Sequence, residues 1–230
     1  MLRIEHVSKT FESGGQPLTV LRDIDLHFEA RCTAALVGPS GSGKTTLLGL
    51  CAGLDRPSSG NIQLGDQRLN ELDEEQLAVL RREQVGFIFQ SFRLVPSLTA
   101  LENVMVPAEL LGNREARQRG RDLLADVGLQ DRHHHYPTQL SGGEQQRVAI
   151  ARAFINEPSI IFADEPTGNL DDDTGGHVLD LLFGLNRDQG TTLVLVTHDH
   201  ALTNRVQQIV TLRGGQVIQQ RANRPATGSR

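Results

Sequence analysis

Short apolar runs dominate the pattern of hydrophobic and polar positions along this chain. Four of them have no polar face and are too short for typical helices, so they predict strands buried on both sides, as in a parallel sheet covered by helices. They occupy residues 33–37, 85–89, 159–163 and 192–196. At 23–28 apolar and polar residues alternate, which predicts a strand with one exposed face. Shorter runs at 2–7 and 61–64, and a hairpin at 209–219, predict further strands.

The stretch from 91 to 136 changes from strand patterns to helical ones. Thr99 followed by Glu102 forms a capping box, which marks the start of a helix. We therefore expect a helical insertion, at about 91–145, between two strands of the main sheet. The helices predicted along the whole chain occupy residues 46–50, 73–82, 99–111, 114–127 and 141–156.

The composition is that of an ordinary globular protein, with 230 residues, 38% hydrophobic and 22% charged. A formal net charge of −5 argues against a nucleic-acid binder that depends on a broad basic face. Cys32 and Cys51 lie in apolar sequence and imply no disulfide framework, which fits a reducing compartment. No apolar run approaches the roughly eighteen residues of a membrane span, and the N-terminus lacks a signal-peptide pattern. We therefore expect a cytosolic chain, or one held at a membrane only by a partner.

The stretch between the strand at 33–37 and the helix after it matches the phosphate-binding loop pattern. Its residues are Gly38, Pro39, Ser40, Gly41, Ser42, Gly43, Lys44 and Thr45. Glycines let the backbone turn tightly so that N–H groups point at phosphates, and the helix start adds its positive end. Lys44 would reach the β- and γ-phosphates, and the Thr45 hydroxyl would bind the bridging Mg²⁺. The alternative is a glycine-rich turn that contains a lysine by chance.

A second helix start suited to an anion is predicted at residues 141–144. Ser141 and Glu144 form another capping box, which does not require Gly142 and Gly143. Glycine in a first helical turn costs about 1 kcal/mol relative to alanine, so the pair favours close approach of a ligand to the backbone. A flexible helix start is the alternative.

Titratable residues follow two of the buried strands. Asp164 directly follows the strand at 159–163. In phosphate-loop proteins an acid at the end of such a strand binds Mg²⁺, which suits Asp164. Glu165 would then polarise an attacking water. A pair of helix-capping acids is the alternative. His198 follows the strand at 192–196, at the edge where parallel sheets bind ligands, although a histidine there is usually a surface residue.

Three further features have two interpretations each. Phe11 precedes a turn at 13–15, and its ring either stacks on a purine base or packs in the core. His133-His134-His135 has no partner at ligand spacing, so a solvated loop is favoured over a metal site. Residues 91–96 hold three apolar side chains in a segment that Pro96 keeps from regular helix. That segment either packs under the helical insertion or forms an exposed patch for another protein.

Together these motifs resemble the nucleotide-binding subunit of ATP-binding cassette (ABC) transporters. The resemblance is carried by residues 38–45, Gln90, residues 140–145, Asp164, Glu165 and His198. It implies an α/β fold of the P-loop NTPase (RecA-like) type, with a mostly parallel sheet, an N-terminal antiparallel β subdomain and a helical insertion. It covers about residues 2–220, so we expect one nucleotide-binding domain over 1–220 and a disordered polar tail at 221–230.

The resemblance also implies roles, with ATP and Mg²⁺ bound and ATP hydrolysis coupled to transport. The expected catalytic residues are Lys44, Gln90, Glu165 and His198. The expected nucleotide contacts are Phe11, Gly38, Pro39, Ser40, Gly41, Ser42, Gly43, Lys44, Thr45, Thr46, Ser141, Gly142, Gly143 and Glu144. The expected Mg²⁺ ligands are Thr45, Gln90 and Asp164. Residues 169–171 would form the D-loop at a dimer contact.

A narrower resemblance is to the lipoprotein-release and macrolide-export group, and within it to bacterial stand-alone ATPases. Residues 87–92, 101–104 and 162–171 carry it. It implies a head-to-tail dimer, in which the signature at 141–145 of one copy faces the phosphate loop of the other. It also implies a separate integral membrane permease of the MacB/FtsX-like type, which holds the ATPase at the cytoplasmic face of the bacterial inner membrane. The work done would be export, extraction or force transmission on a lipoprotein or hydrophobic compound, without nucleic acid and without membrane insertion of this chain.

The competing class is a soluble, non-transport ABC ATPase that acts on a macromolecular complex. ATPases of DNA repair or chromosome organisation would need a long coiled-coil insertion, and a translation factor would carry two cassettes. A small-molecule kinase would share the phosphate loop but would have no use for residues 141–143. A transporter subunit therefore explains more of the motifs than any of these classes.

Overall fold

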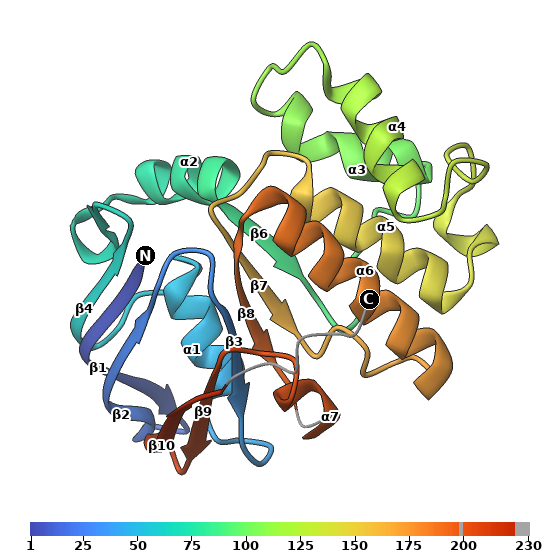
Figure 1. The fold of residues 1–230 in the computed structure, drawn as a ribbon. Helices are drawn as coiled ribbons and strands as arrows, with labels where there is room; N and C mark the ends of the chain where they lie inside the picture. The colour runs from blue at the N-terminus through green and yellow to red at the C-terminus, as the bar shows by residue number, and fades with distance from the viewer. Residues whose placement is uncertain (198–199, 224–230) are drawn as a thin grey trace. The chain divides into compact units, whose positions relative to one another are not determined.

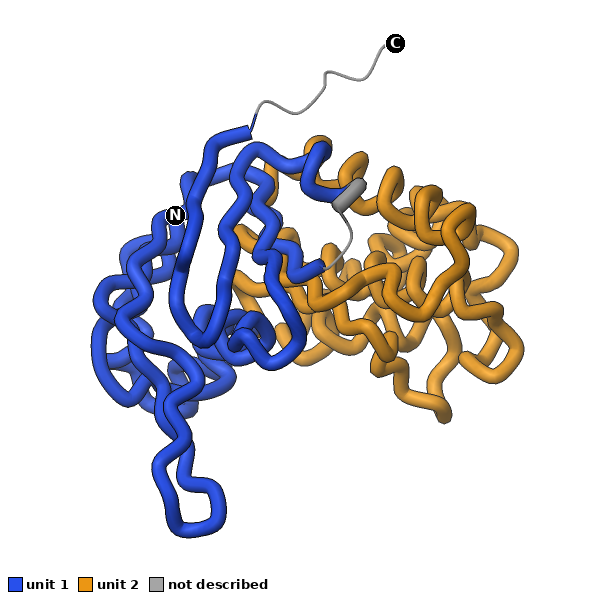
Figure 2. The backbone as a smooth tube through the Cα atoms, turned by 90° about the horizontal axis from the view of Figure 1, so that it is seen from below, with its two compact units in different colours: residues 1–81, 192–230 blue, residues 82–191 orange. Residues whose placement is uncertain are grey.

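The structure, a computed structural model, describes residues 1–197 and 200–223, and its chain divides into two compact units (Figure 2). The first unit contains residues 1–81 and 192–230, and the second contains residues 82–191. His198, one of the expected catalytic residues, lies outside the described residues, as do residues 224–230 of the expected tail.

The first unit contains an antiparallel sheet with the strand order β2-β1-β4-β5 (Figure 1). Its strands are β1 (Leu2–Ser13), β2 (Gln16–Phe28), β4 (Ser59–Leu64) and β5 (Gln67–Arg68). The expected turn at 13–15 joins β1 to β2, and Ser13 still pairs with Gln16. Both strands are longer than predicted. The prediction missed the tip of this hairpin because its residues are exposed and show no apolar alternation.

The first unit also contains a set of mostly parallel strands. In it β3 (Thr33–Val37) pairs in parallel with β8 (Thr192–Val196) on one side and β9 (Gln208–Arg213) on the other, and β10 (Gln216–Ala222) is antiparallel to β9. Arg221 and Ala222, expected in the polar tail, instead pair with Ile209 and Gln208. The strand continues there because backbone pairing does not need apolar side chains on an exposed strand.

Helices of the first unit are short. They are α1 (Lys44–Cys51), the single 3₁₀ turn η1 (Leu69–Glu71) and α7 (His200–Thr203), while α2 (Glu74–Gln84) leads from the first unit into the second.

The second unit combines one parallel strand pair with a group of helices. Strand β6 (Val85–Ile88) pairs with β7 (Ile160–Asp164). Its helices are α3 (Ala100–Glu109), α4 (Ala116–Asp126), the 3₁₀ turn η2 (Pro137–Gln139), α5 (Gly142–Phe154) and α6 (Asp172–Gln189). Helix α5 contacts α3, α4 and α6, and the capping box predicted at Thr99 is present. Within the described residues, no helix has both the length and the apolar character needed to cross a membrane.

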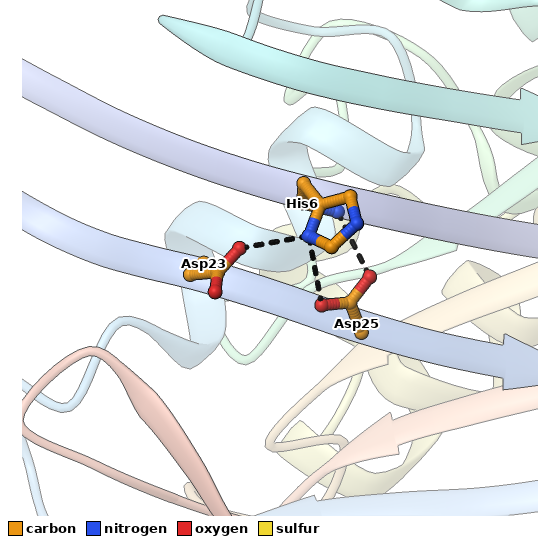
Figure 3. Close-up of side chains that lie close together, drawn as sticks. All are labelled: His6, Asp23 and Asp25. Carbon is orange, nitrogen blue, oxygen red and sulfur yellow. Dashed lines mark hydrogen bonds and ion pairs between the residues drawn. The ribbon is translucent and has the colours of Figure 1, made fainter.

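An exposed charged cluster lies on the hairpin of the first unit (Figure 3). His6 Nδ1 lies 3.0 Å from Asp23 Oδ1 and 3.4 Å from Asp25 Oδ2. The hydrogen bond with Asp23, followed by the charge of Asp25, raises the pKa of His6. The three side chains therefore form an ion-paired surface cluster whose charge depends on pH.

Candidate functional site

The phosphate-loop sequence forms the turn between β3 and α1 in the first unit. Two of its glycines are required by close approach of other segments. A Cβ atom on Gly38 (φ 149°) would lie 2.1 Å from the backbone oxygen of Leu212, and one on Gly43 (φ 98°) would lie 2.6 Å from Leu21 Cδ2. Any side chain at these positions would push the loop away from β9 or β2. The sequence thus fixes a tight turn against two strands.

The start of α1 has no side-chain cap among the described residues. Gly43 is the N-cap residue, and the first turn contains no acidic side chain. The first N–H groups of a helix lack partners within the helix, and the helix dipole adds partial positive charge there. An uncapped start of this kind suits an anion such as phosphate.

Two polar side chains of the loop also suit an anion. Lys44 Nζ donates hydrogen bonds to the backbone oxygens of Gly38 and Pro39, both at 2.9 Å, and Lys44 is only 9% exposed. The Ser42 hydroxyl is buried without a hydrogen-bond partner among the described residues. A buried hydroxyl normally has a partner, so this one fits a turn that closes around a polar ligand. Thr45 is exposed and Thr46 is half-buried.

The expected residues of the second unit converge beyond the ends of β6 and β7. Ile88 pairs with Ala163, so Gln90 and Glu165 follow at the same level of the two parallel strands. A Cβ atom on Gly168 would lie 2.8 Å from Gln90 Nε2 and 3.2 Å from Glu165 Oε2. Asn169 Nδ2 donates to the backbone oxygen of Gln90 at 2.9 Å. The structure therefore brings Gln90 and Glu165 together around a glycine that leaves their side chains room.

Glu165 has a left-handed backbone conformation (φ 46°), which is unusual for a residue with a long side chain. Asp164, just before it, is the half-buried last residue of β7. The next helix, α6, is capped by Asp171, whose carboxylate accepts the Thr174 N–H at 3.0 Å. Asp164 and Glu165 are therefore not the capping pair that the sequence left as an alternative.

The capping box predicted at the start of α5 is present. The Ser141 N–H donates to Glu144 Oε2 at 2.8 Å, and the Glu144 N–H donates to Ser141 Oγ at 3.2 Å. The Ser141 N–H is the main reason that the pKa of Glu144 is lowered. A Cβ atom on Gly143 would lie 2.4 Å from Thr174 Cγ2, whereas one on Gly142 would meet its nearest atom at 3.5 Å. Packing against α6 thus explains Gly143 without a ligand, and only Gly142 stays without such a structural reason.

Phe11 is 39% exposed, so it does not pack in the core, and Lys9 Nζ lies 4.7 Å from the centroid of its ring. In the histidine run, His133 Nδ1 is hydrogen-bonded to the backbone oxygen of Gln130 at 2.7 Å. The ring of His134 lies beside that of His133, with centroids 4.0 Å apart.

Sequence reasoning missed two residues that shape the segment after Gln90. Arg152 of α5 donates to the backbone oxygens of Phe92 at 2.8 Å and Arg93 at 2.6 Å, and both of these residues have positive φ. Asn103 of α3 binds the backbone of Val95 through both its amide atoms. Arg152 lies 60 positions from Phe92 and 59 from Arg93 in the sequence, and Asn103 lies 8 positions from Val95. No local sequence pattern could therefore have indicated these contacts.

Comparison with known proteins gives consistent matches. A family model described as "ABC transporter" matches residues 21–168. The chain is 51% identical over 219 residues to the uncharacterized ABC transporter ATP-binding protein YbbA of Escherichia coli K12, covering 94% of this chain and 96% of that protein. It is 46% identical over 217 residues to the lipoprotein-releasing system ATP-binding protein LolD of Idiomarina loihiensis, covering 94% and 95%.

Two further matches complete the comparison. The chain is 48% identical to the macrolide export ATP-binding/permease protein MacB of Pectobacterium atrosepticum, covering 98% of this chain but 35% of that protein. The solved dimeric structure of the ATP-binding cassette MJ0796, in a post-hydrolysis state bound to ADP and Pi, has a TM-score of 0.89 and 39% identity, covering 97% of this chain and 99% of that one. The expected fold class and group are confirmed by these matches.

Proposed function

Because this chain belongs to the ABC transporter family, as an ATP-binding subunit that hydrolyses ATP, we propose that two copies of it power a separate integral membrane permease. The observation that carries the proposal is that one chain has both a phosphate loop, which ends in the uncapped helix start at Gly43, and a second helix start with glycines in its first turn, at Ser141. A single nucleotide needs one such helix start. A head-to-tail dimer uses both, because the signature of each copy completes the phosphate loop of the other. The solved structure of MJ0796 is dimeric, which supports a dimer of this chain.

In this proposal the phosphate loop holds the triphosphate. Residues 38–46, apart from Pro39, supply backbone N–H groups. The Lys44 ammonium turns from its loop carbonyls toward the β- and γ-phosphates, and the Ser42 hydroxyl gains a partner. Phe11 stacks on the adenine. Residues 141–144 of the partner copy contact the γ-phosphate from the other side.

The residues assigned to metal binding fit Mg²⁺. Thr45, Gln90 and Asp164 offer a hydroxyl, an amide oxygen and a carboxylate, which are the hard oxygen donors that this ion prefers. When bound, the ion would neutralise charge on the phosphates during their transfer to water.

Glu165 is the general base in this proposal. Its carboxylate accepts a proton from water as the water oxygen attacks the γ-phosphorus and the bond to the β-phosphate oxygen breaks. Gln90 lies beside Glu165 over Gly168. In this proposal Gln90 contacts the Mg²⁺ and the attacking water, so that hydrolysis changes the conformation of residues 91–96. His198 would hydrogen-bond the γ-phosphate.

The permease would be of the MacB/FtsX-like type and would bind residues 91–96, where Val95 is 42% exposed. It would hold the ATPase at the cytoplasmic face of the inner membrane. The names of LolD and MacB support a lipoprotein or another hydrophobic compound as the class of cargo.

Co-purification tests this proposal. The tagged chain is expressed in its native bacterium, membranes are dissolved in mild detergent, and captured integral membrane proteins are identified by mass spectrometry. We expect one permease with a large periplasmic domain, and an ATPase rate per chain that differs between the complex and the isolated subunit. Capture of a soluble complex without any integral membrane protein would instead support the non-transport class.

A further inference from the structure

The hairpin of β1 and β2 contains a contact that the roles above do not use. Lys9 and Phe11 lie two residues apart on β1, where the pairing with β2 shifts register after Lys9. Lys9 Nζ lies 4.7 Å from the centroid of the Phe11 ring, within the range of a cation–π interaction. Lys9 is 8% exposed, whereas Phe11 is 39% exposed. The sequence has two lysines, Lys9 and Lys44, and otherwise uses arginine for its cationic side chains. This use of lysine indicates that residue 9 needs a compact ammonium group.

The Lys9 ammonium is held in place by the loop after α1. Lys9 Nζ donates to the backbone oxygen of Arg56 and lies beside Asp55 Oδ2, both at 2.7 Å. The Arg56 N–H in turn donates to Asp55 Oδ1 at 2.7 Å. Burial alone would raise the pKa of Asp55, but the hydrogen bond from Lys9 brings it below its ordinary value. Two short charge-assisted bonds leave the ammonium little freedom to move away from the ring.

The same strand pair supports the phosphate loop. Lys9 pairs with Leu21 across the hairpin, and Leu21 Cδ2 is the atom that a Cβ on Gly43 would meet first. Phe11 pairs with Leu18 further along the hairpin. The cation–π pair is therefore fixed to the strands against which the loop folds, all within the first unit.

We propose that Lys9 is a positioning residue for the nucleotide base, which holds one face of the Phe11 ring so that the other face receives adenine. This inference rests on the proposed role of Phe11. A cation on one face draws π electrons toward it, which lowers repulsion between the opposite face and the π cloud of a stacked purine. A ring already held in place also loses less conformational freedom when the base binds.

The test compares two ligands that differ in the base. Affinities for Mg²⁺-ATP and for Mg²⁺-tripolyphosphate, which has no base, are measured by calorimetry on the full-length wild type, Lys9→Met, Phe11→Ala and the double variant. We expect Lys9→Met to weaken ATP binding about threefold to tenfold and to leave tripolyphosphate binding unchanged. In the Phe11→Ala background, Lys9→Met should have no further effect on ATP.

Equal loss for both ligands would show that Lys9 only supports the fold of the loop, and no loss for either would also overturn the inference. If Phe11→Ala leaves the affinity for ATP unchanged, the role proposed for Phe11 is wrong, and the inference about Lys9 is wrong with it. If the wild type binds no ATP, the proposed function itself is refuted. Should Lys9→Met not fold, Asp55→Asn loosens the same anchor at a half-exposed side chain. It should produce a smaller loss that is again confined to ATP.

Discussion

At the scale of single residues, Glu165 combines a left-handed backbone with a carboxylate that lies beside Gln90 over Gly168. Glu165→Gln keeps the shape of the side chain and removes the charge that polarises water, so ATP hydrolysis should fall about a hundredfold or more. ATP binding should persist, and two chains should then stay together in gel filtration with ATP. Glu75→Gln, an exposed change on α2, is the matched control. A Glu165→Gln rate near that of the control would remove Glu165 from the role of general base.

His6 gives a prediction about pH. Its pKa is raised by Asp23 and Asp25, so the folded state binds a proton more tightly than the unfolded chain, whose histidine pKa is about 6.5. The resulting stability is fully present below about pH 6.5 and is lost as the pH rises through the raised pKa. His6→Asn should therefore lower the melting temperature more at pH 6 than at pH 8.5. His177→Asn on the exposed side of α6 controls for the substitution, and a His6→Asn deficit that does not change with pH would contradict the prediction.

At the scale of elements, the features that the sequence could predict are those with a local cause. The buried strands, the capping boxes at Thr99 and Ser141 and the phosphate loop depend on residues a few positions apart. Helix α6 was not predicted, because three glycines weaken its propensity and packing of residues such as Val178 and Leu182 decides its formation. The bonds from Arg152 to the segment after Gln90 could not be predicted either, because they join residues 59 and 60 positions apart.

The contact of α5 with α6 explains one glycine and can be tested. Gly143→Ala would place a methyl group 2.4 Å from Thr174 Cγ2, so it should destabilise the protein by about 1–3 kcal/mol in chemical unfolding. Adding Thr174→Ser removes the clashing methyl group and should restore the lost stability. Gly142→Ala is the control, since its new atom would meet only ordinary contacts at 3.5 Å or more. Equal stability of the two alanine variants would show that α6 does not impose the glycine.

The segment 91–96 is held by Arg152 and Asn103 in an irregular shape that leaves Leu94 half-buried and Val95 more exposed. Leu94→Asp should give a folded protein with unchanged ATP affinity that no longer co-purifies with the permease, because a charge in an apolar contact is costly. The same change at Leu110, which is 65% exposed at the end of α3, is the control and should leave the complex intact. A collapsed melting temperature of Leu94→Asp would assign Leu94 to the core, and a surviving complex would place the docking surface elsewhere.

At the scale of the whole molecule, the head-to-tail dimer that we propose brings the helix start at Gly43 of one copy and the helix start at Ser141 of the other to one nucleotide. Lys44→Ala should lose most of its affinity for ATP, because it removes the ammonium that the loop holds across its own carbonyls. Ser141→Arg should still bind ATP as a single chain but should not hydrolyse it, because the bulky cation at the start of α5 spoils the contribution to the partner. Each variant alone should be inactive.

Mixing the two inactive variants separates a shared site from two self-contained ones. In a mixed dimer, the intact loop of the Ser141→Arg copy meets the intact signature of the Lys44→Ala copy, so one of the two sites works. With random pairing about half of the dimers are mixed, and the mixture should recover at most about a quarter of the wild-type rate. Adding Glu165→Gln to the Ser141→Arg copy, which supplies the general base of that site, should abolish the recovery, whereas adding it to the Lys44→Ala copy should not. Differential tags show whether mixed dimers form. Mixed dimers without ATPase activity would falsify the shared site, because each contains one intact phosphate loop with its general base and one intact signature.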